Sequence, residues 1–141
     1  MGKALETNLI ETAIGAAKLA YAPYSGYYVG AALLTKGGEI FTGCNIENAS
    51  FGGTNCAERT AFFKAVSEGN TEFQAIAIVG GAADGAGESR FSDFAYPCGI
   101  CRQVMQEFCE PDFVILVAKS VKDYKRYTLQ ELLPYGFGRK E

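Results

Sequence analysis

Histidine is absent from the 141 residues of this chain. That absence excludes nucleophilic sites of the Ser-His-Asp or Cys-His type, and it excludes every metal site that needs an imidazole ligand. No apolar run approaches the roughly 20 residues that a membrane-spanning helix needs. Positive charge is not in excess, since 13 Lys and Arg stand against 16 Asp and Glu, for a formal net charge of −3. We therefore expect no membrane span and no binding to nucleic acid.

The length fits a single domain, 1–141, with enough chain to build a hydrophobic core. The segment from Met1 to Glu6 has neither the apolar region of a secretory signal nor the hydroxyl residue of a myristoylation motif. Five cysteines are present, and in a reducing compartment this odd number favours a metal or thiol role over a disulfide framework. We expect a cytoplasmic protein.

The hydrophobic pattern predicts helices that alternate with strands after an initial hairpin. Helices are predicted over 5–21, 55–67, 97–109 (with Pro97 in its first turn) and from 128, and strands over 27–35, 39–44, 73–80, 112–118 and 124–127. The connection 81–96 has no sustained period and, at about 16 residues, is long enough to suggest a functional or mobile segment. This order of elements predicts an α/β fold with a mixed sheet and helices on both faces.

Two predicted helix N-termini carry three of the five cysteines. Cys56 lies in TNCAERTA, and Cys98 and Cys101 lie in PCGIC. Helices of such a fold begin beyond the carboxyl ends of strands, where open α/β sheets build their sites. Because residues three apart share a helix face, Cys98 and Cys101 can bind one ion, and Cys56 can join them from the other helix. Three ligands leave one tetrahedral position open, as in catalytic zinc sites and unlike closed structural ones.

Two charged residues follow Cys56 and fit this metal hypothesis. Glu58 could exchange a proton with water at the open position, provided that Cys56 and Glu58 lie in the first turn, because a spacing of two separates side chains in mid-helix. Arg59 can donate hydrogen bonds to a thiolate. Together with the two helix N-termini, it would offset the net negative charge of one zinc ion with three thiolates. Arg59 is therefore predicted to tune the metal, and Arg102, beside Cys101, is a weaker candidate.

Other interpretations of these residues stay open at this point. A Cys98-x-x-Cys101 pair at a helix start also suits a redox dithiol. Cys56 could be a buried core thiol. Glu58 has the spacing of the third helical residue in a capping box opened by Asn55. A non-catalytic zinc module would need a fourth ligand, for which only Cys44, in the predicted hairpin, and Cys109, about two helical turns further along, are available.

Cys-Ala-Glu followed by Pro-Cys-Gly-Ile-Cys-Arg-Gln resembles the zinc-dependent nucleoside deaminases, in which His/Cys/Cys or three Cys hold zinc and a Glu that is not a ligand exchanges protons. The all-cysteine set is similar to that of the small homotetrameric cytidine deaminases. The resemblance extends over nearly the whole chain through YAPYSGYYVGAALLT, GCNIENASFGGTNCAERTAFFKAVSEG, PCGICRQVMQEF and TLQELLPYGF.

This resemblance implies a three-layer α-β-α cytidine deaminase-like fold with a five-stranded mixed sheet. It implies one Zn²⁺ per subunit on Cys56, Cys98 and Cys101, no organic cofactor, and a homotetramer whose sites are completed by neighbouring subunits. The implied reaction is hydrolytic deamination of cytidine and deoxycytidine to uridine and deoxyuridine with release of ammonia, in pyrimidine salvage. In it, Glu58 takes a proton from the attacking water, protonates N3 and helps the amine leave.

The resemblance also implies residues that bind the small-molecule nucleoside. Asn45 and Glu47 would bind the ribose 3′-hydroxyl, and Tyr27 stands where the family has a phenylalanine packing against the pyrimidine. The chain around Ala57 would contact the O2 and N3 atoms of the base, and Phe137 would enter a neighbouring subunit's site. Alternatively, Asn45 and Glu47 could merely hydrogen-bond the backbone, and either aromatic ring could be ordinary packing or part of an interface.

The sequence departs from the family pattern at the rim of the expected pocket. Gly26-Tyr27-Tyr28 replaces a Lys-Phe-Pro-like stretch, and the 81–96 connection is long. A blasticidin-type deaminase shares the metal motif, but Asn45-Ile46-Glu47-Asn48 favours plain cytidine because it supplies the ribose contact. A non-catalytic zinc module and a thiol-redox protein are the alternatives from other functional classes. An assay with cytidine together with elemental analysis for zinc distinguishes the deaminase, the non-catalytic zinc module and the thiol-redox protein.

Overall fold

Helices and strands alternate after an initial hairpin, as the hydrophobic pattern predicts. The computed structural model describes residues 1–82 and 91–139. The elements are α1 (Lys3–Ala17), β1 (Tyr27–Thr35), β2 (Ile40–Cys44), the short 3₁₀ helix η1 (Phe51–Gly53), α2 (Ala57–Ser67), β3 (Phe73–Ala82), α3 (Gly99–Phe108), β4 (Val114–Ser120), β5 (Asp123–Thr128) and α4 (Leu129–Leu132).

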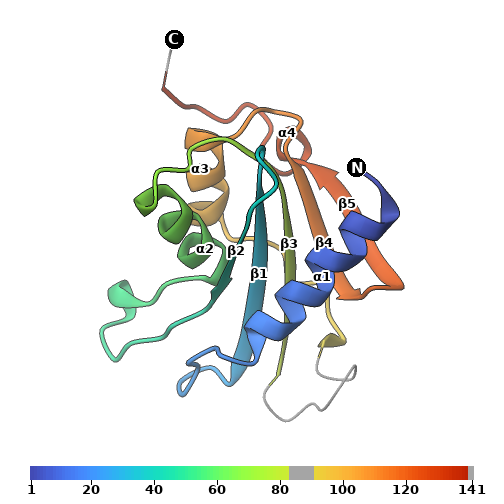
Figure 1. Ribbon diagram of the computed structural model, residues 1–141. Helices are drawn as coiled ribbons and strands as arrows, with labels where there is room; N and C mark the ends of the chain where they lie inside the picture. The colour runs from blue at the N-terminus through green and yellow to red at the C-terminus, as the bar shows by residue number, and fades with distance from the viewer. Residues whose placement is uncertain (83–90, 140–141) are drawn as a thin grey trace.

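Five strands form one mixed sheet in the order β2-β1-β3-β4-β5. Strand β1 is antiparallel to both of its neighbours, β3 and β4 are parallel, and β5 returns antiparallel to β4. Helix α1 crosses one face of the sheet, and α2 and α3 cover the other (Figure 1). This arrangement confirms the predicted three-layer α/β fold.

The alternation of side chains along β1 divides the core into two parts. Ala31 and Leu33 belong to the cluster that contains the buried face of α2, whereas Ala32 and Leu34 belong to the cluster beneath α1. The central strand β3 contributes buried side chains to both clusters, which explains its nearly continuous apolar run.

Two glycines let the helices approach the sheet closely. A Cβ atom built on Gly30 would lie 2.1 Å from the carbonyl oxygen of Ala13 in α1. A Cβ atom built on Gly43 would lie 2.2 Å from the carbonyl oxygen of Ala57 in α2. Since both obstacles are backbone atoms, no side-chain movement could make room for a larger residue.

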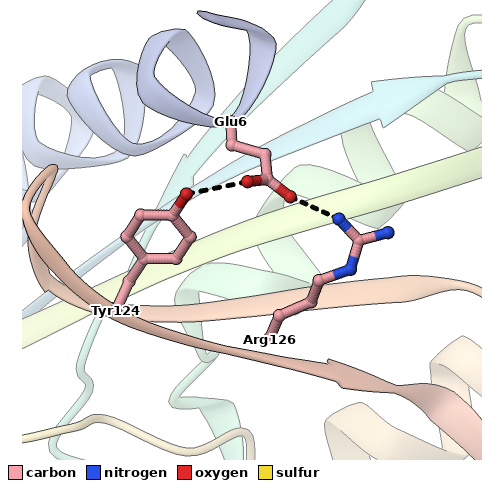
Figure 2. Close-up of polar contacts among 3 residues, drawn as sticks. All are labelled: Glu6, Tyr124 and Arg126. Carbon is pink, nitrogen blue, oxygen red and sulfur yellow. Dashed lines mark hydrogen bonds and ion pairs between the residues drawn. The ribbon is translucent and has the colours of Figure 1, made fainter. Parts of the chain in front are cut away.

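A buried carboxylate links α1 to the edge strand β5 (Figure 2). Glu6, only 7% exposed, accepts a hydrogen bond of 2.7 Å from the Tyr124 hydroxyl. Its other oxygen pairs with Arg126 Nη1 at 2.5 Å. Both carboxylate oxygens are thus partnered, as burial of a charge requires.

The observed helices differ from their predicted ranges by one to four residues, and two of these differences have a clear cause. Helix α1 ends at Ala17 instead of Tyr21, because the backbone of Tyr21 bonds to Asn45 and Glu47 and forms an isolated bridge with Ile46. Cys98 is the N-cap of α3, so Pro97 lies outside the helix instead of in its first turn.

The last helix was predicted to begin with a capping box, and the connection before α3 was predicted to be long. The capping box that opens α4 is present, with Glu131 N–H donating to Thr128 Oγ1. Strand β3 extends to Ala82, and residues 83–90 of the predicted functional segment 81–96 lie outside the described residues. Among the helices of residues 1–82 and 91–139, none combines the length and hydropathy that crossing a bilayer requires.

Candidate active site

The first turns of α2 and α3 place three cysteines at one end of the sheet. Cys56 and Cys98 are the N-caps of their helices and have extended backbone conformations. Cys101 is the third residue of α3 and is buried. Glu58 is the second residue of α2, so Cys56 and Glu58 have the first-turn geometry that the metal hypothesis requires.

The three sulfur atoms lie close enough to share one metal ion. Cys56 Sγ and Cys98 Sγ are 3.7 Å apart, and all three Sγ atoms lie within 4.8 Å of one another. Sulfurs bound tetrahedrally at a Zn–S distance of 2.3 Å would be about 3.8 Å apart. The donor set therefore fits zinc. Within the described ranges 1–82 and 91–139, no other group of three or more metal-ligating side chains comes together in this way.

Arg59 lies against the sulfur cluster, where it was predicted. Its Nη2 donates to Cys56 Sγ at 3.4 Å. A hydrogen bond from Cys101, together with those from Arg59 and Cys98, lowers the pKa of Cys56 to about 5. The pKa of Cys101 is raised, first by its hydrogen bond to Cys56 and then by burial. The pocket thus favours a thiolate at Cys56, which is the form that a metal binds.

Arg102, the weaker candidate for tuning the metal, is engaged elsewhere. Its Nε donates to the Pro97 carbonyl at 2.7 Å, and its Nη1 donates to the Leu132 carbonyl at 2.6 Å. These bonds join the turn before α3 to the end of α4. Neither bond reaches a sulfur, and both hold the chain that carries Cys98, so an action of Arg102 on the sulfurs stays a prediction.

Glu58 is the buried acid beside the sulfurs, with only 4% of its surface exposed. Burial, aided by the negative charge of Cys56, raises its pKa to about 7. A carboxyl group with a pKa near neutrality can both accept and return a proton. The capping-box alternative is wrong, because the N-cap is Cys56, and Asn55 instead donates to Thr60 Oγ1 at 3.1 Å.

A cleft of about 490 Å³ opens beside the sulfur cluster. That volume is in the range of small-ligand sites. Its lining contains seven of the predicted site residues, namely Tyr27, Asn45, Glu47, Cys56, Ala57, Glu58 and Cys98.

Phe137 lies apart from this cleft. Its side chain is 80% exposed, and its carbonyl accepts a hydrogen bond of 2.9 Å from Gln103 Nε2 in α3. Its predicted entry into a neighbouring subunit's site stays a prediction.

Asn45 stabilises the start of β1 while it lines the cleft. Its Oδ1 accepts from Val29 N–H at 2.9 Å, and its Nδ2 donates to the Tyr27 carbonyl at 2.8 Å. Both of these bonds go to backbone groups, as the alternative interpretation of Asn45 expects. Within the described part of the chain, the amide keeps one N–H and one acceptor position for a ligand, because it has two of each.

Glu47 is held by the turn that precedes β1. Its Oε1 accepts from the backbone N–H groups of Tyr24 and Ser25 at 2.9 and 3.1 Å, and its Oε2 accepts from Ser25 Oγ at 2.5 Å. The Ser25 hydroxyl bond, with help from the two backbone bonds, lowers the pKa of this carboxyl group. Glu47 is thus fixed in place as a carboxylate.

Two aromatic residues of the cleft wall were not predicted from the sequence. Phe94 lines the cleft, and the ammonium groups of Lys119 and Lys125 each lie 4.5 Å from the centre of its ring. Tyr96 also lines the cleft, and its hydroxyl hydrogen-bonds that of Tyr127 at 2.8 Å. The sequence did hold one signal for them, since both aromatic residues lie directly before the second cysteine motif. The segment around them, however, has no sustained hydrophobic period from which a structure could be predicted.

Known proteins are similar to this chain over nearly its full length. The family model for the cytidine and deoxycytidylate deaminase zinc-binding region matches residues 4–117. A cytidine deaminase of Halalkalibacterium halodurans is 50% identical over 129 residues, covering 92% of this chain and 91% of its own. A cytidine deaminase of Sporosarcina psychrophila is 45% identical over 133 residues, covering 94% and 91%. A crystal structure of cytidine deaminase from Burkholderia pseudomallei superposes with a TM-score of 0.81 at 45% identity, covering 92% of this chain and 97% of that one.

Proposed function

This chain belongs to the cytidine and deoxycytidylate deaminase family, and from that premise we propose that it hydrolyses cytidine and deoxycytidine to uridine and deoxyuridine, with release of ammonia, in pyrimidine salvage. One observation carries the proposal: three cysteine sulfurs lie within 4.8 Å of one another, and two of these cysteines, Cys56 and Cys98, line the same cleft as the buried acid Glu58. A redox dithiol would need only two of the sulfurs, and it would leave the buried carboxyl group without a purpose.

Cys56, Cys98 and Cys101 would hold the metal, one Zn²⁺ per subunit. Bound zinc supplies the Lewis acidity that makes water a nucleophile near neutral pH. The positive ends of α2 and α3, together with Arg59, offset the negative charge of the three thiolates. We assign Arg59 this tuning role because its guanidinium contacts Cys56 directly.

Glu58 moves the protons of the reaction. Its carboxylate takes a proton from the attacking water as the water oxygen bonds to C4 of the cytosine ring. The same carboxyl group delivers that proton to N3. The second hydrogen of the water passes to the 4-amino group, which leaves as ammonia while C4 becomes a carbonyl. A pKa of about 7 suits a group that must take and return protons in each cycle.

The remaining cleft residues would bind and orient the nucleoside. Asn45 and Glu47 supply a donor and an acceptor to the ribose 3′-hydroxyl, Tyr27 packs against the pyrimidine, and the backbone at Ala57 contacts the base. All four residues line the cleft that contains Glu58, which supports these roles.

The proposal also covers how the chain assembles and where in the cell it is located. The chain 1–141 forms one domain, and four copies form a homotetramer in the cytoplasm. The 80% exposure of Phe137 supports its role in completing a neighbouring subunit's site, because so large an apolar side chain gains from being covered.

The test is a Glu58→Ala variant assayed with cytidine. Loss of the proton carrier should lower kcat by at least about 10²- to 10⁴-fold. Zinc content, measured by elemental analysis, should stay at one ion per chain, and cytidine should still bind. Glu107→Ala, which removes an exposed carboxylate of α3, is the matched control and should retain full activity. Substantial deamination by the Glu58→Ala protein would contradict the assignment.

A further inference from the structure

Counted over the residues that the structure describes, the turn at Tyr24 and Ser25 leaves the Glu47 carboxylate with a single free acceptor position. A carboxylate has about four acceptor positions, two on each oxygen. On Oε1, both are used by the backbone N–H groups of the turn, and on Oε2 one is used by the Ser25 hydroxyl. The position that remains is on Oε2. Since Glu47 lines the cleft beside Glu58, a hydroxyl group of a bound sugar can reach it.

Among the described residues, 1–82 and 91–139, the Ser25 hydroxyl is the one hydrogen-bond partner of this oxygen. Both backbone bonds converge on Oε1, and the terminal torsion of a glutamate is broad, so they alone would leave Oε2 free to swing. Ser25 Oγ accepts from the Tyr27 N–H at 3.0 Å, which leaves its own hydrogen to donate to Glu47. Gly26, with φ of 65°, allows the tight turn that brings Oγ back to that N–H.

We propose that Ser25 is a positioning residue of the sugar subsite, whose hydroxyl orients Glu47 Oε2 to accept a hydrogen bond from the nucleoside 3′-hydroxyl. This inference rests on the proposed function, because it needs a nucleoside in the cleft. Ser25 does not touch the reacting atoms, and it acts on the substrate through Glu47. Its loss weakens a contact that is made equally in the ground state and in the transition state, so it raises KM more than it lowers kcat.

The experiment compares Ser25→Ala with the unaltered chain on two substrates, cytidine and 3′-deoxycytidine. With cytidine, we expect kcat/KM to fall about tenfold, mostly through KM, since hydrogen bonds to charged groups are strong. With 3′-deoxycytidine, which has no hydroxyl for Glu47 to bind, the two proteins should differ less than about twofold. Ser25→Thr keeps a hydroxyl group at this exposed position and should restore cytidine activity.

Two further proteins separate positioning from simple damage to the turn. Ser67→Ala removes a hydroxyl that bonds the Lys64 carbonyl at the end of α2, and it should leave both substrates unaffected. In a Glu47→Gln background, Ser25→Ala should add less than about a twofold loss, because the carboxylate that it positions is already gone. Equal losses on cytidine and 3′-deoxycytidine, or no loss on either, would overturn the inference.

The outcome for Ser25 is separable from the outcome for the proposed function. Failure of the unaltered chain to release ammonia from cytidine would refute the deaminase assignment alone. Calorimetric binding of cytidine and 3′-deoxycytidine would then carry the same comparison, with Ser25→Ala expected to weaken only cytidine. If neither the rates nor the binding constants distinguish the two nucleosides, Ser25 has no positioning role.

Discussion

Gly43→Ala should damage the metal centre by moving the helix that carries Cys56. Gly43 lies on β2 directly beneath α2, and a methyl group there would sit 2.2 Å from the Ala57 carbonyl oxygen and 2.5 Å from Ala61 N. Ordinary contacts of this kind are about 3.4 Å, so α2 must shift by about 1 Å to accommodate the methyl group. Cys56 immediately precedes Ala57 and must move with it.

A displacement of this size should weaken zinc binding and also destabilise the fold. Metal–ligand distances tolerate only about 0.2 Å, so a 1 Å movement of one sulfur should weaken zinc binding by at least about tenfold. Overpacking against backbone should also lower the free energy of unfolding by about 3 kcal/mol, equal to a fall in Tm of about 10 °C for a chain of this length. This outweighs the gain of about 0.4–1 kcal/mol that a Gly→Ala change makes through the unfolded state.

Gly30→Ala is the matched control for this experiment. It creates a similar clash, 2.1 Å from Ala13 O, but on the opposite face of the sheet and against α1. Zinc affinity is measured by competition with a chromogenic chelator, and Tm by circular dichroism. Both variants should lose stability, and only Gly43→Ala should lose zinc affinity. Equal zinc affinities in the two variants would refute the argument that the packing of α2 on the sheet sets the sulfur geometry.

Three other perturbations address the rest of the molecule. Glu6→Gln removes the buried charge that pairs with Arg126, and it should lower the free energy of unfolding by about 1–2 kcal/mol in urea titrations, since that arginine is half exposed. Arg59→Gln should keep zinc at one ion per chain but lower kcat about tenfold, because the charge beside Cys56 is lost. The lowered pKa of Glu47 keeps this carboxylate ionised at pH 4.5, its ordinary pKa value, where an unshifted glutamate would be half protonated, so KM for cytidine should stay constant from pH 7 down to about pH 4.5.

Each of these predictions has its own control. For Glu6, the exposed Glu11→Gln on the same helix should leave stability unchanged, and an equal loss there would point to a general effect of charge. For Arg59, normal turnover at full zinc content would remove its tuning role. For Glu47, parallel measurements with 3′-deoxycytidine separate carboxylate titration from loss of the metal at acid pH. A rise in KM for cytidine alone at or above pH 4.5 would contradict the lowered pKa.

The sequence predicts the order and type of the elements because each apolar run has the period of its structure. The runs at β3 and β4 are short and nearly continuous, and both strands are buried between helices. Helix ends are less predictable, because contacts distant in sequence decide them. The stretch up to Tyr21 continues the helical spacing of α1, yet its backbone bonds to the loop around Asn45, which no local pattern shows.

The metal set could be predicted because its chemistry is concentrated in two short motifs. Cys56 and Glu58 lie within one turn, and the spacing of Cys98 and Cys101 is that of one helix face. By contrast, the clamp of Ser25 on a carboxylate 22 positions away depends on how two loops meet. Composition and spacing do not show that these loops meet, so the residue that we propose to orient the sugar subsite can be found only from the folded chain.

The choice of cysteine at two N-caps connects the stability of the fold with its chemistry. Helices usually begin with Ser, Thr, Asp or Asn, and losing such a cap costs about 1 kcal/mol. Within the residues that the structure describes, neither Cys56 nor Cys98 makes a capping hydrogen bond with its side chain. Both sulfurs therefore stay available to a metal, and they lie at the positive ends of their helices. The positive potential at a helix N-terminus favours a thiolate over a thiol. It therefore acts at the same two positions where a cysteine replaces the usual capping residue.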